Sequence, residues 1–239
     1  MKTIRKLFLG EMRRMVSYKI LPVSLATSVL WIIAFLLVSK TEAQSIAPLL
    51  LFTDVVMMSI LLVGASHHLE RQEGTVKSML VMPVSIGQIA ASKIMASLAL
   101  SLESAVVTSA ALYFIHGVTL NYGLLLLAVI VSGAAHAVIG YSLSLWSRDF
   151  SSMLGILFLY IVIFAVPSIL MILKVIPASY DWLLLISPSH AAQTQINAAF
   201  AGAGDVLKLL ASYGYLAVLT AVLMLWHVYP GFKRHAVRG

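Results

Sequence analysis

The chain has 239 residues, of which 61% are hydrophobic and only 10% are charged, and its mean hydropathy is +0.99. So few polar side chains could not cover a soluble protein of this mass, which excludes a soluble globular domain. Cysteine is absent, which excludes disulfides and thiol chemistry. The net charge of +7 comes from basic residues at the ends of apolar runs. Membrane topology explains basic residues at these places, so the charge does not indicate binding to nucleic acid.

Residues 1–19 are predicted to form a helix that lies on the membrane surface. Apolar side chains recur at helical spacing on one face of this segment, and lysines and arginines take the other face. A basic leader that only sets topology is the alternative. The apolar run that follows, residues 20–38, is longer than the apolar part of a signal peptide, about 7 to 15 residues. We therefore expect this run to be retained as a spanning helix and the mature protein to start at Met1.

Six apolar runs are long enough to cross a hydrocarbon core of about 30 Å, which takes about 20 helical residues. Helices are expected because unpaired backbone groups are costly in lipid and the runs lack the alternation of barrel strands. The sequence thus predicts an all-α integral membrane protein with one domain, residues 1–239. The predicted spans are residues 20–38, 47–65, 89–115, 122–145, 153–173 and 207–229.

The distribution of basic residues predicts the orientation of these spans. An even number of spans places both termini on one side of the membrane. Of the 16 lysines and arginines, all except Lys40, Lys174 and Lys208 fall on that side. Because basic residues are enriched in cytoplasmic segments, both termini are predicted to be cytoplasmic.

Among the polar residues inside the predicted spans, Asp54, Glu103 and His136 are the candidates for a functional role. An ionised side chain at this depth costs several kcal/mol unless it faces protein or water. We therefore expect these residues to line a translocation path or to hold two chains together, with His136 or Tyr141 as a partner of the carboxyl groups. A protonated carboxyl group that bonds neighbouring helices is the alternative.

Residues 67–88 form a polar segment between the second and third spans, and we expect it to work in water and to dock a soluble partner. Gly74 permits a sharp backbone turn. Thr75 can then cap a short helix, which Pro83 would end. The apolar side of this short helix would carry Val76, Met79 and Leu80.

The third span begins with a capping signal, since Ser85 and Gln88 have the spacing of a capping box. The segment before it should therefore be two rigid turns around a short helix. His67 and His68 precede these turns, but they form a single pair without the spacing of a zinc motif, so no metal site is expected.

Residues 174–206 form a second unusual loop, on the extracellular side. Ser187 followed by Pro188 predicts the start of a short helix, which would run over residues 188–201 and end at Gly202. The apolar residues before it are too few to cross the membrane, which favours a hairpin that re-enters the outer leaflet over a seventh span. Its polar residues are Gln193, Gln195 and Asn197.

The order and spacing of several residues resemble the permeases of the ABC type-2 exporter family. The resemblance covers nearly the whole chain: a surface helix, six spans, a polar loop after the second span and an Ile-Ser-Pro segment, residues 186–188, before the last span. Within the polar loop it rests on Glu70, Arg71, Glu73, Gly74, Thr75, Leu80, Pro83, Val84, Ser85, Ile89 and Lys93.

The resemblance implies a half-transporter of a prokaryotic plasma membrane that pairs with a second permease chain, identical or related. An ABC ATP-binding subunit would bind ATP and Mg²⁺ on the cytoplasmic face, and this chain would hold no cofactor. Residues 70–75, the elbow, would transmit movement from that subunit, together with Val76, Met79, Leu80, Pro83 and Ser85. Cargo would be a hydrophobic or amphipathic small molecule, such as a drug or a lipid-like compound.

The chain is not expected to be an enzyme. Its nearest match to a phosphate-binding loop, residues 87–93, lacks the second glycine and is followed by Ile94 where a magnesium-binding hydroxyl is needed. Two other functions are weighed. Asp54 and Glu103 could serve a proton- or cation-coupled secondary transporter, although no inverted repeat is evident. Ser142 and His227 could serve a rhomboid-like intramembrane protease, although the glycines typical of that family are missing.

Overall fold

The structure is a computed structural model that describes residues 2–75, 83–202 and 204–231. Every regular element in this part of the chain is helical, and six helical segments are long and apolar enough to cross a membrane. They correspond one to one to the predicted spans, so an all-α membrane protein with six spans is confirmed. The segments are Ile20–Leu37, Lys40–Gln72, Ile86–His116, Tyr122–Trp146, Phe150–Ile172 and Val206–Gly231.

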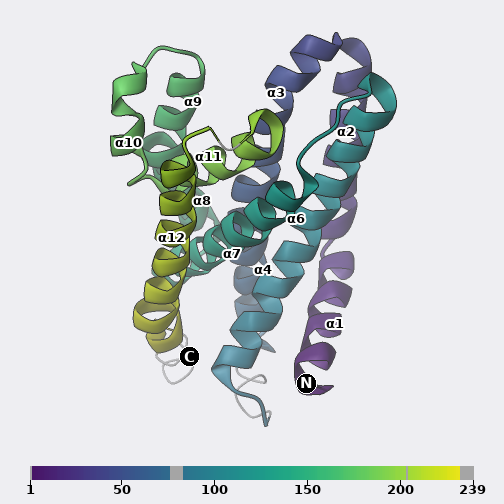
Figure 1. The fold of residues 1–239 in the computed structure, drawn as a ribbon. Coiled ribbons are helices and arrows are strands. Elements are labelled where there is room, and N and C mark those ends of the chain that lie inside the picture. Colours follow the sequence, from purple (N-terminus) through teal and green to yellow (C-terminus); the bar gives the residue numbers. More distant parts are fainter. Residues whose placement is uncertain (1, 76–82, 203, 232–239) are drawn as a thin grey trace.

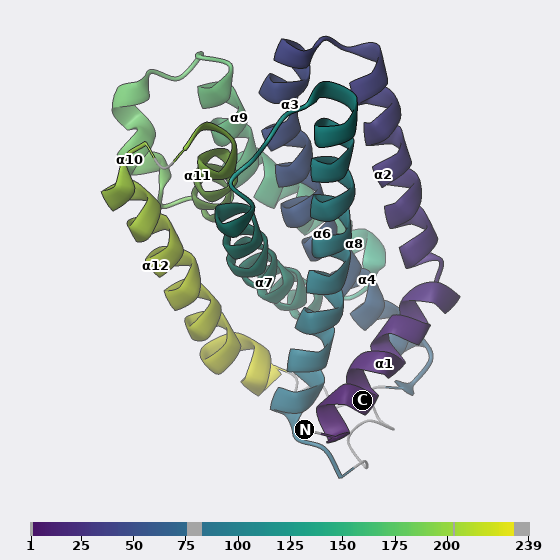
Figure 2. The ribbon, with the colours of Figure 1, turned by 45° about the vertical axis from the view of Figure 1, so that its right-hand side comes forward.

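The chain begins with a separate helix, α1 (Lys2–Ser17), followed by the first span, α2 (Ile20–Leu37). Lys19 between them has a left-handed backbone, with φ of 62°, and this conformation ends α1. Figures 1 and 2 show α1 running obliquely beside the start of α6 (Ile86–His116), the third span. The helix predicted near the N-terminus is therefore present, and its position on the membrane surface stays a prediction.

The second span is longer than the sequence predicts. It consists of α3 (Lys40–Phe52), a π-helical turn (Thr53–Met58) and α4 (Ser59–Gln72). Together they make 33 residues, a rod of about 50 Å. A capping box of Ser39 and Glu42 stabilises the start of this rod. Its other end runs through residues that the hydropathy pattern assigns to a polar loop.

The fourth span, α7 (Tyr122–Trp146), is the centre of the bundle. It packs against α4 and α6 and also against α11 (Pro188–Ala201) and α12 (Val206–Leu223). Of its spanning stretch 61% is buried within the chain, against 17% for α2 and for the last span, so α2 and α12 present most of their surface to lipid or to another chain.

Close packing of α4 on α7 depends on one glycine. A Cβ atom placed on Gly140 would lie 2.5 Å from the carbonyl oxygen of Ile60 and 2.7 Å from its Cα. The two backbones therefore approach more closely than any side chain at this position would allow, as is common where small residues lie between membrane helices.

The last two spans also contain π-helical turns. The fifth consists of α8 (Phe150–Tyr160), a π-helical turn (Ile161–Ala165) and α9 (Val166–Ile172). In the sixth, α12 is followed by the π-helical turn Met224–Val228.

The loop between the fifth and sixth spans contains a short 3-10 turn (Ala178–Tyr180), the four-residue α10 (Asp181–Leu184) and then α11. Ser187 caps α11, Pro188 is in its first turn, and Gly202 ends it with φ of 87°. The predicted helix over residues 188–201 is thus confirmed. It packs against α3, α7 and α12, while its depth in the membrane stays a prediction.

Figures 1 and 2 show that the start of α1 and the end of the last span lie at the same end of the bundle, called the terminal end below. The α9, α10 and α11 region lies toward the opposite end, called the far end. This arrangement is the one that an even number of spans requires.

Candidate functional site

The elbow lies at the terminal end, where α4 stops. Gly74 has φ of 68°, a left-handed conformation that glycine adopts without strain, so the sharp turn predicted there is confirmed. The Thr75 hydroxyl donates to the Glu70 carbonyl at 3.1 Å, which fastens the turn back onto α4. Glu73 and Gly74 are exposed. The side chains predicted to follow, Val76, Met79 and Leu80, lie outside the described residues.

The chain re-enters the bundle through a rigid helix start. Pro83 is exposed, and the Ser85 hydroxyl accepts from the Gln88 amide at 3.2 Å while the Gln88 side chain accepts from the Ser85 amide at 3.0 Å. This reciprocal pair is the predicted capping box.

The first part of the polar segment is not solvated, which corrects the sequence-based expectation. His67 and Glu70 are fully buried and His68 is 3% exposed. The physical reason is that α4 continues past the apolar run and packs these side chains against neighbouring helices. His68 bonds the hydroxyl of Ser147 at 2.8 Å, and Arg71 donates to the Ser147 carbonyl at 3.2 Å, so both side chains fasten α4 to the end of α7.

Glu70 belongs to a buried charge cluster that also contains Glu11, Arg14 and Lys93. Arg14 of α1 donates to Glu70 at 2.6 Å and to Glu11 at 2.8 Å. Lys93 of α6 donates to Glu70 and lies 3.3 Å from Glu11. Burial raises the pKa of Glu11 above its ordinary value, and the charge of Lys93 opposes that rise. These four charged side chains thus connect α1, α4 and α6.

A second contact joins α1 to the elbow. The Tyr18 hydroxyl donates to the Glu73 carboxylate at 2.6 Å. Partial burial and this hydrogen bond raise the pKa of Tyr18 to about 12, so the hydroxyl keeps its proton.

The sequence interpretation missed Glu11, assigned Arg14 to the polar face of the surface helix and to topology, and used Lys93 for topology and for the family resemblance. The available signal was an acidic residue within a basic surface helix, together with a lysine about one turn inside the predicted third span.

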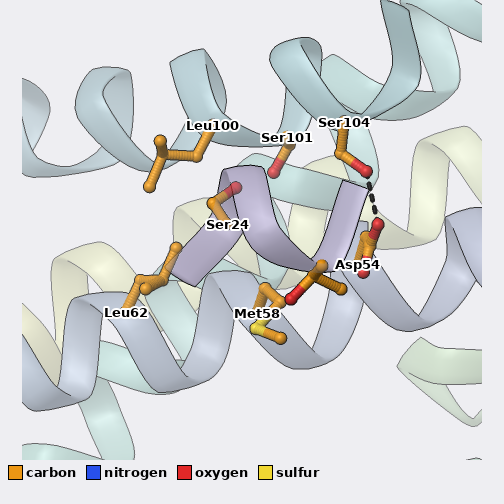
Figure 3. Close-up of a pocket in the computed structure, with 8 residues that line it drawn as sticks. Ser24, Asp54, Met58, Leu62, Leu100, Ser101 and Ser104 are labelled. Carbon is orange, nitrogen blue, oxygen red and sulfur yellow. Dashed lines mark hydrogen bonds between the residues drawn. The ribbon is translucent and has the colours of Figure 1, made fainter. Parts of the chain in front are cut away.

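Asp54 is bonded by side chains from two neighbouring spans. The Trp31 indole N–H of α2 donates to it at 2.8 Å, and Ser104 of α6 also donates to it. Figure 3 shows Asp54 and Ser104 in a pocket between these helices. The lining residues are Ser24, Thr27, Asp54, Met58, Leu62, Leu100, Ser101 and Ser104.

Glu103 lies in the same seam between α2 and α6. It accepts from Ser24 at 2.9 Å and from Ser28 at 3.1 Å. His136 is elsewhere: it is fully buried on α7, bonds the Ser132 carbonyl at 2.7 Å, and its ring packs 6.3 Å from that of Tyr160. The expected pairing of the carboxyl groups with His136 is therefore wrong, because His136 lies on the part of α7 that meets α8.

The predicted polar residues of α11 face the interior of the bundle. Ser132 of α7 donates to Gln195 at 2.8 Å, and Gln193 donates to Asn197 at 2.8 Å. The Ser187 hydroxyl donates to the Phe164 carbonyl at 2.7 Å. These bonds tie α11 to α7 and to the fifth span.

A far-end cluster, consisting of Asp181, His190, Lys208 and Ser168, was not predicted. Asp181 accepts from His190 at 2.8 Å and from Lys208, and the other ring nitrogen of His190 lies 3.2 Å from the Ser168 hydroxyl. Burial lowers the pKa of His190, against the opposing effect of Asp181. Burial tends to raise the pKa of Asp181, but hydrogen bonds from Lys208 and His190 lower it overall. The cluster joins α9, α10, α11 and α12.

The far-end cluster predicts that acid destabilises the fold. Because the pKa of His190 is lowered by folding, the unfolded chain takes up its proton first as the pH falls below about 6.5, and stability decreases by up to about 1.4 kcal/mol per pH unit. Asp181 adds a loss only below its ordinary pKa, since its pKa is lowered. Thermal unfolding of detergent-solubilised protein between about pH 7.5 and 5 should show a shallower pH dependence for His190→Gln than for the wild type. Parallel curves would contradict this assignment.

The residues of the protease alternative do not form a dyad. Ser142 is 3% exposed, and its hydroxyl has no hydrogen-bond partner among residues 2–75, 83–202 and 204–231. The His227 ring lies against Trp146, with centroids 4.8 Å apart. A serine nucleophile needs a base within hydrogen-bond reach, and this arrangement does not supply one.

In a comparison with protein families, a family model described as ABC-2 type transporter matches residues 3–200. The matched stretch includes α1, the elbow, the buried charge cluster and nearly all of α11. No curated protein matches the chain.

Proposed function

This chain belongs to the ABC-2 type transporter family, and we propose that it is the permease subunit of an ATP-driven exporter, with the elbow as the seat of its ATP-binding partner. The observation that carries the proposal is the elbow itself. A left-handed turn at Gly74 closes the end of a 33-residue membrane helix, with Glu73 exposed directly before it and Glu70 buried one helical turn earlier. Such a turn can pass the displacement of a docked subunit to two spans.

The residues before and after the elbow support a rigid connection. Thr75 fastens the turn onto α4, and the capping box of Ser85 and Gln88 fixes the start of α6. Exposed residues at this end include Glu73, Gly74, Pro83 and Ser85, and a partner could contact them. In the proposal this end is cytoplasmic and both termini lie there, as the basic residues predict.

ATP and Mg²⁺ would be bound by the partner chain. Support comes from Lys93, the lysine of the imperfect phosphate-binding motif, whose ammonium group is 2% exposed and pairs with Glu11 and Glu70. A lysine held in this way is not free to contact a phosphate. The proposed role of this chain is mechanical, without a catalytic residue.

The proposed assembly contains two permease chains, identical or related, in the plasma membrane of a prokaryote. The large apolar surfaces of α2 and α12 leave room for contact with a second chain as well as with lipid. The proposed cargo is a hydrophobic or amphipathic small molecule. The seam between α2 and α6, with Asp54 and Glu103, is the proposed place where polar groups of the cargo would meet the chain.

A proton- or cation-coupled carrier is the second candidate function. The observation in its favour is that no ion pair to Asp54 or Glu103 forms within the described part of the chain. Carboxyl groups inside membrane spans often mark proton or ion pathways in transporters.

Replacing Gly74 by valine should uncouple the partner. A β-branched residue at φ of 68° costs about 1–3 kcal/mol of backbone strain, so the turn should relax to another conformation. Among residues 2–75, 83–202 and 204–231, no atom lies within 4 Å of the added Cβ, so the expected effect is conformational and leaves the bundle intact. The measurement is co-purification of an ATPase subunit with the tagged permease, and ATP hydrolysis by that complex.

Gly87→Ala is the matched control, because Gly87 lies in the first turn of α6 with room for a methyl group. It should bind the ATPase like the wild type. A Gly74→Val protein that keeps full ATPase binding and coupling would contradict the role of the elbow. Proton-driven transport by the purified chain alone, without nucleotide, would favour the carrier instead.

A further inference from the structure

The buried charge cluster has a hub, and that hub is Glu70. The same carboxylate oxygen of Glu70 accepts from Arg14 of α1 at 2.6 Å and from Lys93 of α6. Glu70 itself is carried by α4, one turn before Gly74. Thus one side chain at the base of the elbow holds two other elements.

The cluster is closed in charge. Two carboxylates face two cations, and the side chains of Glu11, Glu70 and Lys93 are at most 3% exposed. Burying charges is expensive, and a hydrophobic set of equal volume is often at least as stable, so a buried ionic set is a weak source of stability. Its better-attested role is to fix one register between elements, because a displaced partner leaves a charge without compensation.

The second bond between α1 and the elbow lies on the same side of α4. Glu73 follows Glu70 by three residues, so both carboxylates lie on one helical face, and Tyr18 donates to Glu73 at 2.6 Å. α1 packs along α6, and Met15, near the end of α1, is buried against Ala96 and Leu100 of that helix. Contacts in the second half of α1 therefore bind it to the elbow and to α6.

We propose that Glu11, Arg14, Glu70 and Lys93 are positioning residues that make α1, the elbow and the start of α6 a single moving body. In this view a displacement of the elbow moves α1 by the same amount. The inference rests on the proposed function, since it concerns the movement that a docked ATPase would drive.

The test measures whether α1 and the elbow move together. The chain contains no cysteine, so Ser17→Cys and Gln72→Cys introduce the only two thiols, both at exposed positions. These positions adjoin Tyr18 and Glu73, which are bonded, so spin labels there lie within the range of dipolar broadening. Electron paramagnetic resonance spectra are recorded for the complex with its ATPase subunit in two states. One state is free of nucleotide, and the other is trapped with ATP and vanadate.

The variant is Glu11→Gln with Arg14→Met and Tyr18→Phe, three changes that lie outside the elbow. It removes the ionic links of α1 and its hydrogen bond to Glu73, and it leaves Glu70 paired with Lys93, so no buried charge is left alone. In the labelled wild type the distance between the two labels should be the same in both states. In the triple variant this distance should change on trapping, while ATPase binding and hydrolysis persist. Arg13→Gln, an exposed cation next to Arg14, is the control and should behave like the wild type.

Three results would overturn the inference: a distance between the labels that changes on trapping in the wild type, a triple variant in which this distance stays fixed, or a triple variant that no longer binds the ATPase. The last result would assign the cluster to folding or docking. Failure of the proposed function is distinguishable, because the wild-type chain would then bind no ATPase at all.

Discussion

Gly140→Ala should destabilise the protein by about 3 kcal/mol, the upper end of the usual cost of overpacking a core. The added Cβ would lie 2.5 Å from the Ile60 carbonyl oxygen and 2.7 Å from its Cα. These are backbone atoms of α4, so no side-chain rotation can relieve the contact, and α4 must shift away from α7. The higher helix propensity of alanine, worth about 1 kcal/mol, offsets only part of this cost.

Two other glycines provide controls for that substitution. At Gly64 an added Cβ would meet the end of the Met153 side chain, which can rotate away, so Gly64→Ala should cost less. At Gly155 no atom of the described residues lies within 4 Å of the added Cβ, so Gly155→Ala should be neutral or stabilising. Thermal unfolding in detergent measures the series. Equal unfolding temperatures for Gly140→Ala and Gly155→Ala would show that α4 and α7 are not in close contact.

Lys93→Met alone should cost about 3–5 kcal/mol, as breaking one partner out of a buried ion pair usually does. Glu11 and Glu70 would then share Arg14 as their one remaining cation in the cluster, and one negative charge would stay uncompensated. The yield of monodisperse protein and its unfolding temperature report the loss. Lys6→Met, on the exposed face of α1, is the control and should change little.

The double variant Glu70→Gln with Lys93→Met should be more stable than Lys93→Met, because it restores the balance of charge. If the four residues act through their charges, two changes should therefore lower the stability less than one change does. If they act through ordinary packing, the second change should lower the stability further. If the double variant were the less stable, the shape of the side chains and not their charge would hold the three elements together.

Local signals account for what the sequence predicted correctly. The capping box of Ser85 and Gln88, the start of α11 at Ser187 and Pro188, and the turn at Gly74 each depend on residues within one or two helical turns. Apolar runs likewise mark spans because each span must meet lipid by itself. For this reason the six spans, their order and the short helix α11 could be predicted without a structure.

Tertiary partners account for what the sequence did not predict. Glu70 was interpreted as solvated because hydropathy treats every carboxylate as water-facing, whereas here Arg14 and Lys93, 56 and 23 residues away, allow it to be buried. Asp54 likewise bonds Trp31 and Ser104, not the histidine expected. Single-sequence patterns carry no information on which distant side chains meet.

The length of the second span sets the height at which a partner meets this protein. A rod of 33 residues, about 50 Å, exceeds the hydrocarbon core of about 30 Å but only slightly exceeds a whole bilayer with its headgroups, about 40–45 Å. If the rod stands upright across the bilayer, the elbow would lie nearly level with the headgroup surface. A subunit docked there would rest its underside on the lipid, so anionic phospholipids would be within reach of both proteins.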